Sequence, residues 1–269
     1  MRNILQLGLH DTVEWFYLND ANWVKHLDER PQRERLPKFY AEDPEPFRYF
    51  GIDVSPGSVN TCYSKFKGQD NTHFIACGVG SSFSVETVPN RYYNDEELKD
   101  WYKFCDEKEN VLFIFMPLKF IIDQLGITDL TALVMDIDGY ELDAISDIHT
   151  WDIKPEFISF EMYMPDPPLV TEMILEHAGY IHIGTYPQYT AAEVADSKTK
   201  FPIQSLHEYH YLHRDVYVEH WKSIEIKHTF YNERFRDTFL SGVRNYGSHR
   251  CLKEHRNYEK STLQVANTS

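Results

Sequence analysis

The feature that most constrains the fold is the alternation of strand-like and helix-like segments along the chain. Short apolar runs rich in β-branched and aromatic residues are separated by longer stretches whose apolar residues have helical spacing. The apolar runs, which we predict to be strands, are residues 3–9, 48–54, 72–80, 131–137, 155–163, 180–186 and part of 207–221. Strands that alternate with helices are typical of an α/β domain. We therefore predict a mostly parallel, seven-stranded sheet with helices on both faces.

The segments between these runs supply the predicted helices. Helical patterns occupy residues 12–29, 58–68, 94–108, the end of 111–126, 140–148 and 167–180. Residues 30–47 carry four prolines and dense charge, so we predict a loop there, and residues 81–89 alternate like a β-extension. We expect one domain over residues 1–222, followed by a helical extension and a flexible tail over 223–269.

Charge and composition exclude several classes of partner. The net charge of −15 disfavours binding to nucleic acid or to an anionic membrane surface, because both need clustered Lys and Arg. No window approaches eighteen consecutive apolar residues, so we expect no transmembrane helix. The four cysteines form no CxxC pair, and the N-terminal segment does not resemble a signal peptide. We predict a protein of the cytoplasm with reduced thiols.

Polar or small residues follow the predicted strands where each strand ends. They are Gly8 and His10 after the first strand, Asp53 after the second, Cys77 and Gly78 after the third, Asp136 and Asp138 after the fourth, and Glu161 after the fifth. In open α/β sheets, ligands bind beyond the carboxyl ends of the strands. The sequence therefore predicts a ligand site at this edge of the sheet.

Asp53 indicates which ligand to expect. An acid at the end of the second strand can accept hydrogen bonds from the ribose hydroxyls of a nucleotide-type cofactor. The alternative is that Asp53 holds the turn at Ser55, Pro56 and Gly57. We favour the cofactor because Gly8 and Gly78 follow neighbouring strands. The dinucleotide pattern GxGxxG and the phosphate-binding pattern GxxxxGK[ST] are both absent, which disfavours NAD, FAD, ATP and GTP.

The ordered set of strand ends resembles one known family. "FGIDVSP", "FIACGVG", "LVMDIDGYELDAISDI", "PEFISFEMY" and "LEHAGY" occur in the order and approximate spacing of FkbM-type methyltransferases. The family's signature D-x-E-G-x-E corresponds to residues 136–141, which read DIDGYE. The resemblance covers roughly residues 3–220. It implies a class I Rossmann-like fold and S-adenosyl-L-methionine (SAM) as the cofactor.

The resemblance also assigns roles to individual residues. Gly8 corresponds to the glycine of the cofactor loop, Asp53 to the acid that binds ribose, and Val54 to a neighbour of the adenine. Cys77 or Gly78 corresponds to the residue at the adenine edge, and Asp136 to the acid near the methionine end of SAM.

A hydroxyl acceptor on a sugar or small metabolite must also lose a proton during methyl transfer. Asp138, His10 and Glu161 are the candidate bases at the predicted edge. Asp136, Asp138 and Glu161 could instead bind a divalent cation, or Asp138 and Glu141 could stabilise the start of the following helix. We predict no metal site. His207, His210, His213 and His220 do not have zinc-ligand spacing.

Some positions depart from the family pattern. Gln6 occupies the place of an acid, the first loop has few glycines, and residues 9–49 form an unusually long connection. These differences leave an alternative open: a non-catalytic Rossmann-like module that binds a nucleotide sugar or a protein partner.

Overall fold

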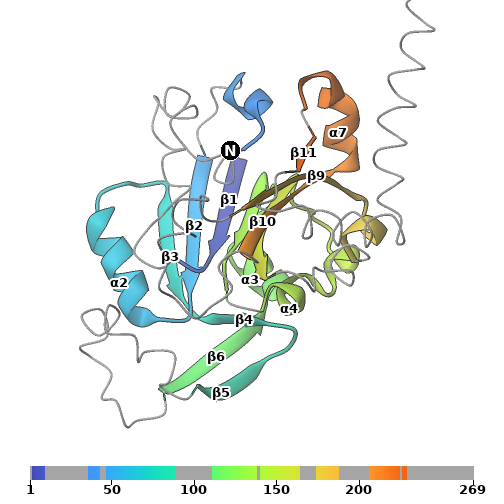
Figure 1. Ribbon diagram of the computed structural model, residues 1–269. Helices are drawn as coiled ribbons and strands as arrows, with labels where there is room; N and C mark the ends of the chain where they lie inside the picture. Colours follow the sequence, from blue (N-terminus) through green and yellow to red (C-terminus); the bar gives the residue numbers. More distant parts are fainter. Residues whose placement is uncertain are drawn as a thin grey trace, which may run out of the picture. The chain divides into compact units, whose positions relative to one another are not determined.

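The computed structural model describes residues 2–9, 36–42, 47–88, 111–137, 140–163, 174–187, 206–224 and 226–228. The chain divides into two compact units. Figure 1 shows their helices and strands. The first unit comprises residues 1–30 and 44–155, and the second comprises residues 31–43 and 156–269. The predicted helices at 12–29 and 94–108 lie outside the described residues.

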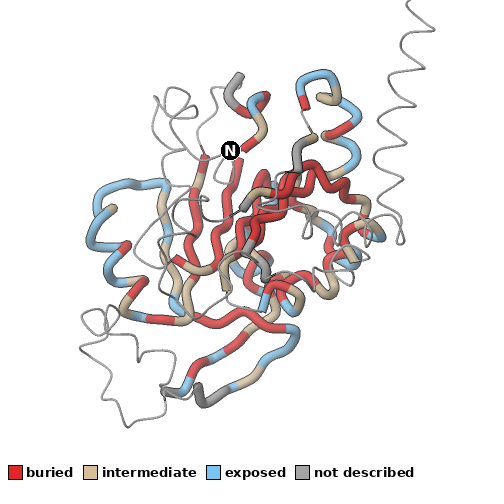
Figure 2. The backbone as a smooth tube through the Cα atoms, in the orientation of Figure 1, coloured by how far each residue is buried: buried red, intermediate tan, exposed pale blue. Residues whose placement is uncertain are grey.

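The main sheet of the first unit contains four parallel strands. They are β1 (Arg2–Leu7), β2 (Phe47–Asp53), β3 (Thr72–Ala76) and β7 (Ala132–Met135), in the order β7-β1-β2-β3. Every residue of β1 and of β7 is buried, as Figure 2 shows in red. Continuous burial is typical of parallel strands covered on both faces, and it explains why polar and apolar residues do not alternate here, although β1 also buries the polar side chains of Asn3 and Gln6.

Short helices connect these strands. Helix α2 (Pro56–Lys65) packs against β2 and β3, and it starts with Pro56 after the N-cap Ser55, whose hydroxyl accepts from the amide of Ser58 at 3.3 Å. Proline is favoured at this position because it has no amide hydrogen to satisfy. Helix α4 (Glu141–Ile145) follows β7 and precedes the 3-10 helix η5 (Ile148–Thr150). Helix α4 lies within the segment 140–148 that we predicted to be helical, and η5 begins at the last residue of that segment.

A small sheet with the order β4-β6-β5 corrects one prediction. The run at residues 72–80 forms two strands, because the chain leaves the main sheet after β3 and continues as β4 (Gly78–Gly80), which pairs with β6 (Val111–Pro117). Strand β5 (Ser84–Val88) confirms the predicted β-extension, and α3 (Leu118–Gln124) follows β6 directly. Val85, Leu112 and Ile114 are exposed on this sheet.

The second unit contains the strands β8 (Phe157–Tyr163), β9 (Tyr180–Pro187), β10 (Leu206–His213) and β11 (Lys227–His228), in the order β11-β9-β10-β8. Strand β10 is antiparallel to both β8 and β9. Aromatic rings stack on one face of this sheet, with ring centroids 5.6 Å apart for Phe160 and Tyr209. The unit also contains η3 (Lys38–Glu42), α7 (Arg214–His220) and η7 (Trp221–Ser223).

The strand order confirms the predicted fold class. Across the sheet the strands follow the mixed order β3-β2-β1-β7-β8-β10-β9 of the class I methyltransferase fold, with β10 as the antiparallel member. Two local predictions change. Residues 207–221 form strand β10 only as far as His213 and then form α7, and Lys227 and His228 are a short strand where we expected helix.

Candidate functional site

Three backbone segments of the first unit meet at Gly8. The amide of Gly8 donates to the carbonyl oxygen of Ile52 at 2.9 Å, and the amide of Asp136 donates to the carbonyl oxygen of Leu7 at 2.9 Å. Gly8 has a φ of +79°, and a Cβ atom built there would lie 1.7 Å from the carbonyl oxygen of Asp136. Glycine is therefore required by the approach of β1 to β7, whether or not a ligand binds.

Asp53 connects this junction to the turn after β2. Its Oδ2 accepts from the amide of Leu9 at 2.8 Å, and its Oδ1 accepts from the amide of Ser55 at 2.7 Å. The interpretation that Asp53 holds the turn at Ser55 is thus confirmed. Asp53 also contacts the loop after β1 through the amide of Leu9, which the sequence did not predict. Asp53 and Val54 are half-buried, and their cofactor roles stay a prediction.

The side chain of Gln6 fixes the same loop through two hydrogen bonds. The side chain is buried; its Nε2 donates to the carbonyl oxygen of Gly8 at 3.0 Å, and its Oε1 accepts from the Tyr49 hydroxyl at 2.6 Å. A carboxylate could accept from Tyr49 but could not donate to Gly8. The departure from the family pattern therefore has a structural role, because it fixes the carbonyl of the loop glycine.

Cys77 and Gly78 form the end of β3 and the start of β4. The amide of Cys77 donates to the carbonyl oxygen of Asp53 at 3.0 Å. Burial raises the pKa of the Cys77 thiol to about 11, so the thiol is neutral at pH 7 and acts as a small apolar group. At Gly78, a Cβ would lie 2.5 Å from Cδ1 of Phe115, so the glycine makes room for that ring. Cys77 and Gly78 are therefore compatible with an apolar surface at the end of β3.

The acids after β7 have separate roles. Asp136 is half-buried at the end of the strand. Glu141 is buried and is the first residue of α4, where its Oε1 accepts from the amide of Ile137 at 3.0 Å. Glu141 thus begins α4, as the helix-start interpretation predicted, and its carboxylate also holds the amide of Ile137 before the helix. Asp138 lies outside the described residues, and so does His10.

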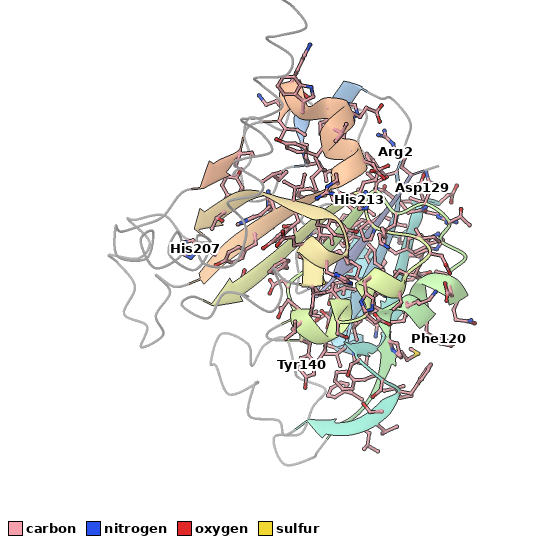
Figure 3. The ribbon with its side chains drawn as sticks, turned by 90° about the vertical axis from the view of Figure 1, so that its right-hand side faces the viewer. Arg2, Phe120, Asp129, Tyr140, His207 and His213 are labelled. Atoms are coloured by element: carbon pink, nitrogen blue, oxygen red, sulfur yellow. The ribbon has the colours of Figure 1, made fainter. Side chains whose placement is uncertain are left out.

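Sequence reasoning missed an aromatic pair beside this segment. The ring of Tyr140 stacks on that of Phe115, with centroids 5.4 Å apart and planes inclined by 27°. Figure 3 shows Tyr140 at the end of the molecule that carries the small sheet. Tyr140 is the N-cap residue of α4 and is exposed. No local sequence pattern links Phe115 of β6 to Tyr140 at the start of α4. The one available signal was that Tyr140 is an aromatic residue within the segment DIDGYE at residues 136–141.

Glu161 is the candidate base that the structure describes. It is half-buried on β8 in the second unit, where it lies directly opposite Glu208 of β10. Among the described residues, no group of three His, Cys, Asp or Glu side chains has the arrangement of a metal site. His207 and His210 point to opposite faces of β10, and His220 stacks on Phe39 with centroids 4.1 Å apart.

Comparison with known proteins gives structural likeness only. The chain matches no family model, and no curated protein matches it. A TehB-like SAM-dependent methyltransferase from Corynebacterium glutamicum covers 78% of this chain and 79% of its own length, with 10% identity and a TM-score of 0.32. A precorrin-6y C5,15-methyltransferase from Geobacter metallireducens covers 78% and 79%, with 11% identity and a TM-score of 0.34.

A third solved structure, a glycopeptide N-methyltransferase complexed with sinefungin, covers 79% of this chain and 81% of its own length, with 7% identity and a TM-score of 0.32. None of the helices that the structure describes is long and apolar enough to cross a membrane.

Proposed function

We propose that this protein is a SAM-dependent methyltransferase of the FkbM type that O-methylates a hydroxyl group of a sugar or small metabolite. The observation that carries the proposal is the position of Asp53. Its carboxylate stands at the carboxyl end of β2, where the amides of Leu9 and Ser55 hold it in a fixed orientation. A fixed carboxylate at this place in an α/β sheet is suited to ribose hydroxyls.

The neighbouring residues fit the other parts of SAM. Val54 and the neutral thiol of Cys77 offer apolar surface to the adenine. Gly78 has no side chain, so the Phe115 ring packs directly against its backbone. Asp136 carries the charge that would hold the ammonium of the methionine part. When bound, SAM supplies a methyl group already activated on a sulfonium. This chain then has to position the acceptor hydroxyl and remove its proton. Asp138, His10 and Glu161 are our candidates for that base.

Calorimetric titration with SAM and with S-adenosylhomocysteine tests the proposal. We expect both to bind the folded wild-type protein. Asp53→Ala should weaken binding by about 1–3 kcal/mol, because it removes a charged hydrogen-bond partner. Asp70→Ala removes the same charge from an exposed position before β3 and should leave the affinity unchanged. Absence of binding by folded wild-type protein refutes the proposed function, and unchanged affinity in Asp53→Ala removes that residue from the site.

The second candidate is a non-catalytic module that binds a nucleotide sugar or a protein partner. Gln6 favours it, because a buried amide takes the place of an acid in the cofactor loop of the family. Transfer of a labelled methyl group from SAM to a panel of glycans and small hydroxyl compounds separates the two. Binding of SAM without transfer to any compound supports the module.

A further inference from the structure

The small sheet of the first unit is apolar on both faces. Along β6, Phe113 and Phe115 are buried, whereas the neighbouring Leu112 and Ile114 are 68% and 60% exposed. Figure 2 shows this alternation of buried and exposed residues. A strand that has one face in water normally carries polar residues on that face. Here the face turned to water is as apolar as the face turned to the core.

Strand β5 continues the exposed face. Val85 lies directly opposite Ile114 in the antiparallel pair and is 66% exposed. Directly opposed residues point to the same face of a sheet. Leu112 and Met116 share that face with Ile114, because side chains alternate along a strand. We call Val85, Leu112, Ile114 and Met116 the outer face. None of these four side chains can carry a charge.

Two phenylalanine rings adjoin the outer face. Phe83 is two residues before Val85, and Phe120, labelled in Figure 3, belongs to α3, which follows β6 directly. Both rings are exposed, and their centroids are 4.8 Å apart with planes inclined by 75°. Aromatic pairs prefer such edge-to-face contacts. The exposed apolar surface is therefore concentrated at the small sheet rather than scattered over single positions.

The size of this surface matches what a weak dimer requires. An aromatic side chain has about 150–250 Å² of surface and an aliphatic one somewhat less, so the exposed rings and aliphatic side chains present on the order of 500 Å². That area is near the upper limit of the apolar patches on monomeric proteins. Two such patches facing each other bury on the order of 1,000 Å², about the smallest area of a specific protein–protein interface.

Charge selects among the partners that an apolar surface can take. The net charge of −15 disfavours an anionic membrane surface. A basic partner protein is favoured by acids on the surface that it covers, and the outer face has none. A second copy of this chain fits better, because an uncharged patch can face itself across a two-fold axis without burying a charge.

We propose that the outer face is the interface of a homodimer in which the small sheets of two copies pack face to face. In such an interface the same patch of each copy contacts the other. The cross-strand pair Val85 and Ile114 forms the middle of the contact, and Phe83 and Phe120 form its margin. The inference goes beyond the proposed function and is independent of it, because the outer face is the side of β6 opposite Phe115 and binds no part of SAM.

Sedimentation velocity of the full chain tests the proposal at protein concentrations from about 1 to about 200 µM, the range suited to a weak dimer. We expect a monomer–dimer equilibrium that shifts with concentration. Val85→Lys and Ile114→Lys each bring two like charges together in the interface, one from each copy, so each should weaken the dimer at least about tenfold. Circular dichroism should show both variants folded, because both positions are exposed. Val218→Lys makes the same change at an exposed position of α7 and should dimerise as the wild type does.

Salt separates an apolar interface from an ionic one. Raising NaCl from about 0.05 M to about 0.5 M screens the repulsion between two copies of charge −15, so the dimer should become tighter. The proposal is overturned if the wild-type protein is monomeric at every concentration, if salt dissociates the dimer, if the dimer persists in both Val85→Lys and Ile114→Lys, or if Val218→Lys weakens it equally. A monomeric wild-type protein that binds phosphatidylcholine vesicles, and loses this binding in Ile114→Lys, would assign the outer face to a lipid surface instead.

Discussion

Gly8 and Gly126 form a natural pair for testing what the backbone junction requires. Both have positive φ angles, +79° and +61°, and both belong to the first unit. A Cβ atom at Gly126 meets nothing within 4 Å, whereas one at Gly8 lies 1.7 Å from the carbonyl oxygen of Asp136. Replacement by alanine therefore introduces the same backbone strain at both positions and a steric clash at Gly8 alone.

The expected magnitudes follow from these contacts. A left-handed alanine costs about 1–2 kcal/mol, and the lower entropy of the unfolded chain offsets about 0.4–1 kcal/mol of that. We expect Gly126→Ala to lower the free energy of unfolding by about 1 kcal/mol. At Gly8, the strands must also move about 1.3 Å apart to restore a 3.0 Å contact. That movement disturbs two backbone hydrogen bonds of about 1 kcal/mol each and the packing around them.

We therefore expect Gly8→Ala to lose about 3–5 kcal/mol, since strain, lost hydrogen bonds and disturbed packing combine there. Urea unfolding followed by the fluorescence of the five tryptophans measures both variants. Equal losses in the two variants would contradict the reasoning, because the clash at Asp136 would then have no cost. An intact Gly8→Ala with wild-type stability would show that β1 and β7 can separate freely.

Three further predictions concern buried groups around the site. Glu141→Ala should lower the free energy of unfolding by about 1–3 kcal/mol, because the Ile137 amide loses its acceptor, whereas Glu141→Gln should lose less; urea titration compares them. Tyr49→Phe should lose about 1 kcal/mol in the same assay, since the Gln6 Oε1 loses its donor. The folded Cys77 thiol binds its proton more tightly than the unfolded one, with a pKa of about 11 against 9.0, so the free energy of unfolding should fall as pH rises between these values. Urea titrations at pH 8 and pH 10 should show a smaller fall in Cys77→Ala than in the wild type.

The fold was predictable from local patterns where burial is continuous. The runs that became β1, β2 and β7 are mostly apolar, without a regular alternation of polar and apolar residues, as expected for strands of a parallel sheet that are buried on both faces. The break between β3 and β4 was not predictable in this way. Residues 72–80 are apolar on both sides of Cys77, and the choice of β6 as partner for β4 depends on residues more than thirty positions later.

The candidate site was predictable at the level of strand ends but not of contacts. The sequence placed Gly8, Asp53 and Asp136 at one edge, and the structure brings their backbones together. It could not show that Gln6 pairs with Tyr49, or that Glu208 faces Glu161, because each pair joins strands that are far apart in the chain. Register is decided by the whole set of facing residues rather than by any single segment.

The junction at Gly8 also has a consequence for the descent of this chain. A lineage that abandoned its ligand would still need glycine at this position to bring β1 against β7, and it would still need the amide of Asp136 to meet Leu7. The backbone supplies both of those contacts, so selection for folding preserves Gly8 but does not preserve the carboxylate of Asp136. Whether related chains keep an acid at position 136 therefore indicates whether ligand binding was retained. An unchanged Gly8 indicates only that the sheet still forms.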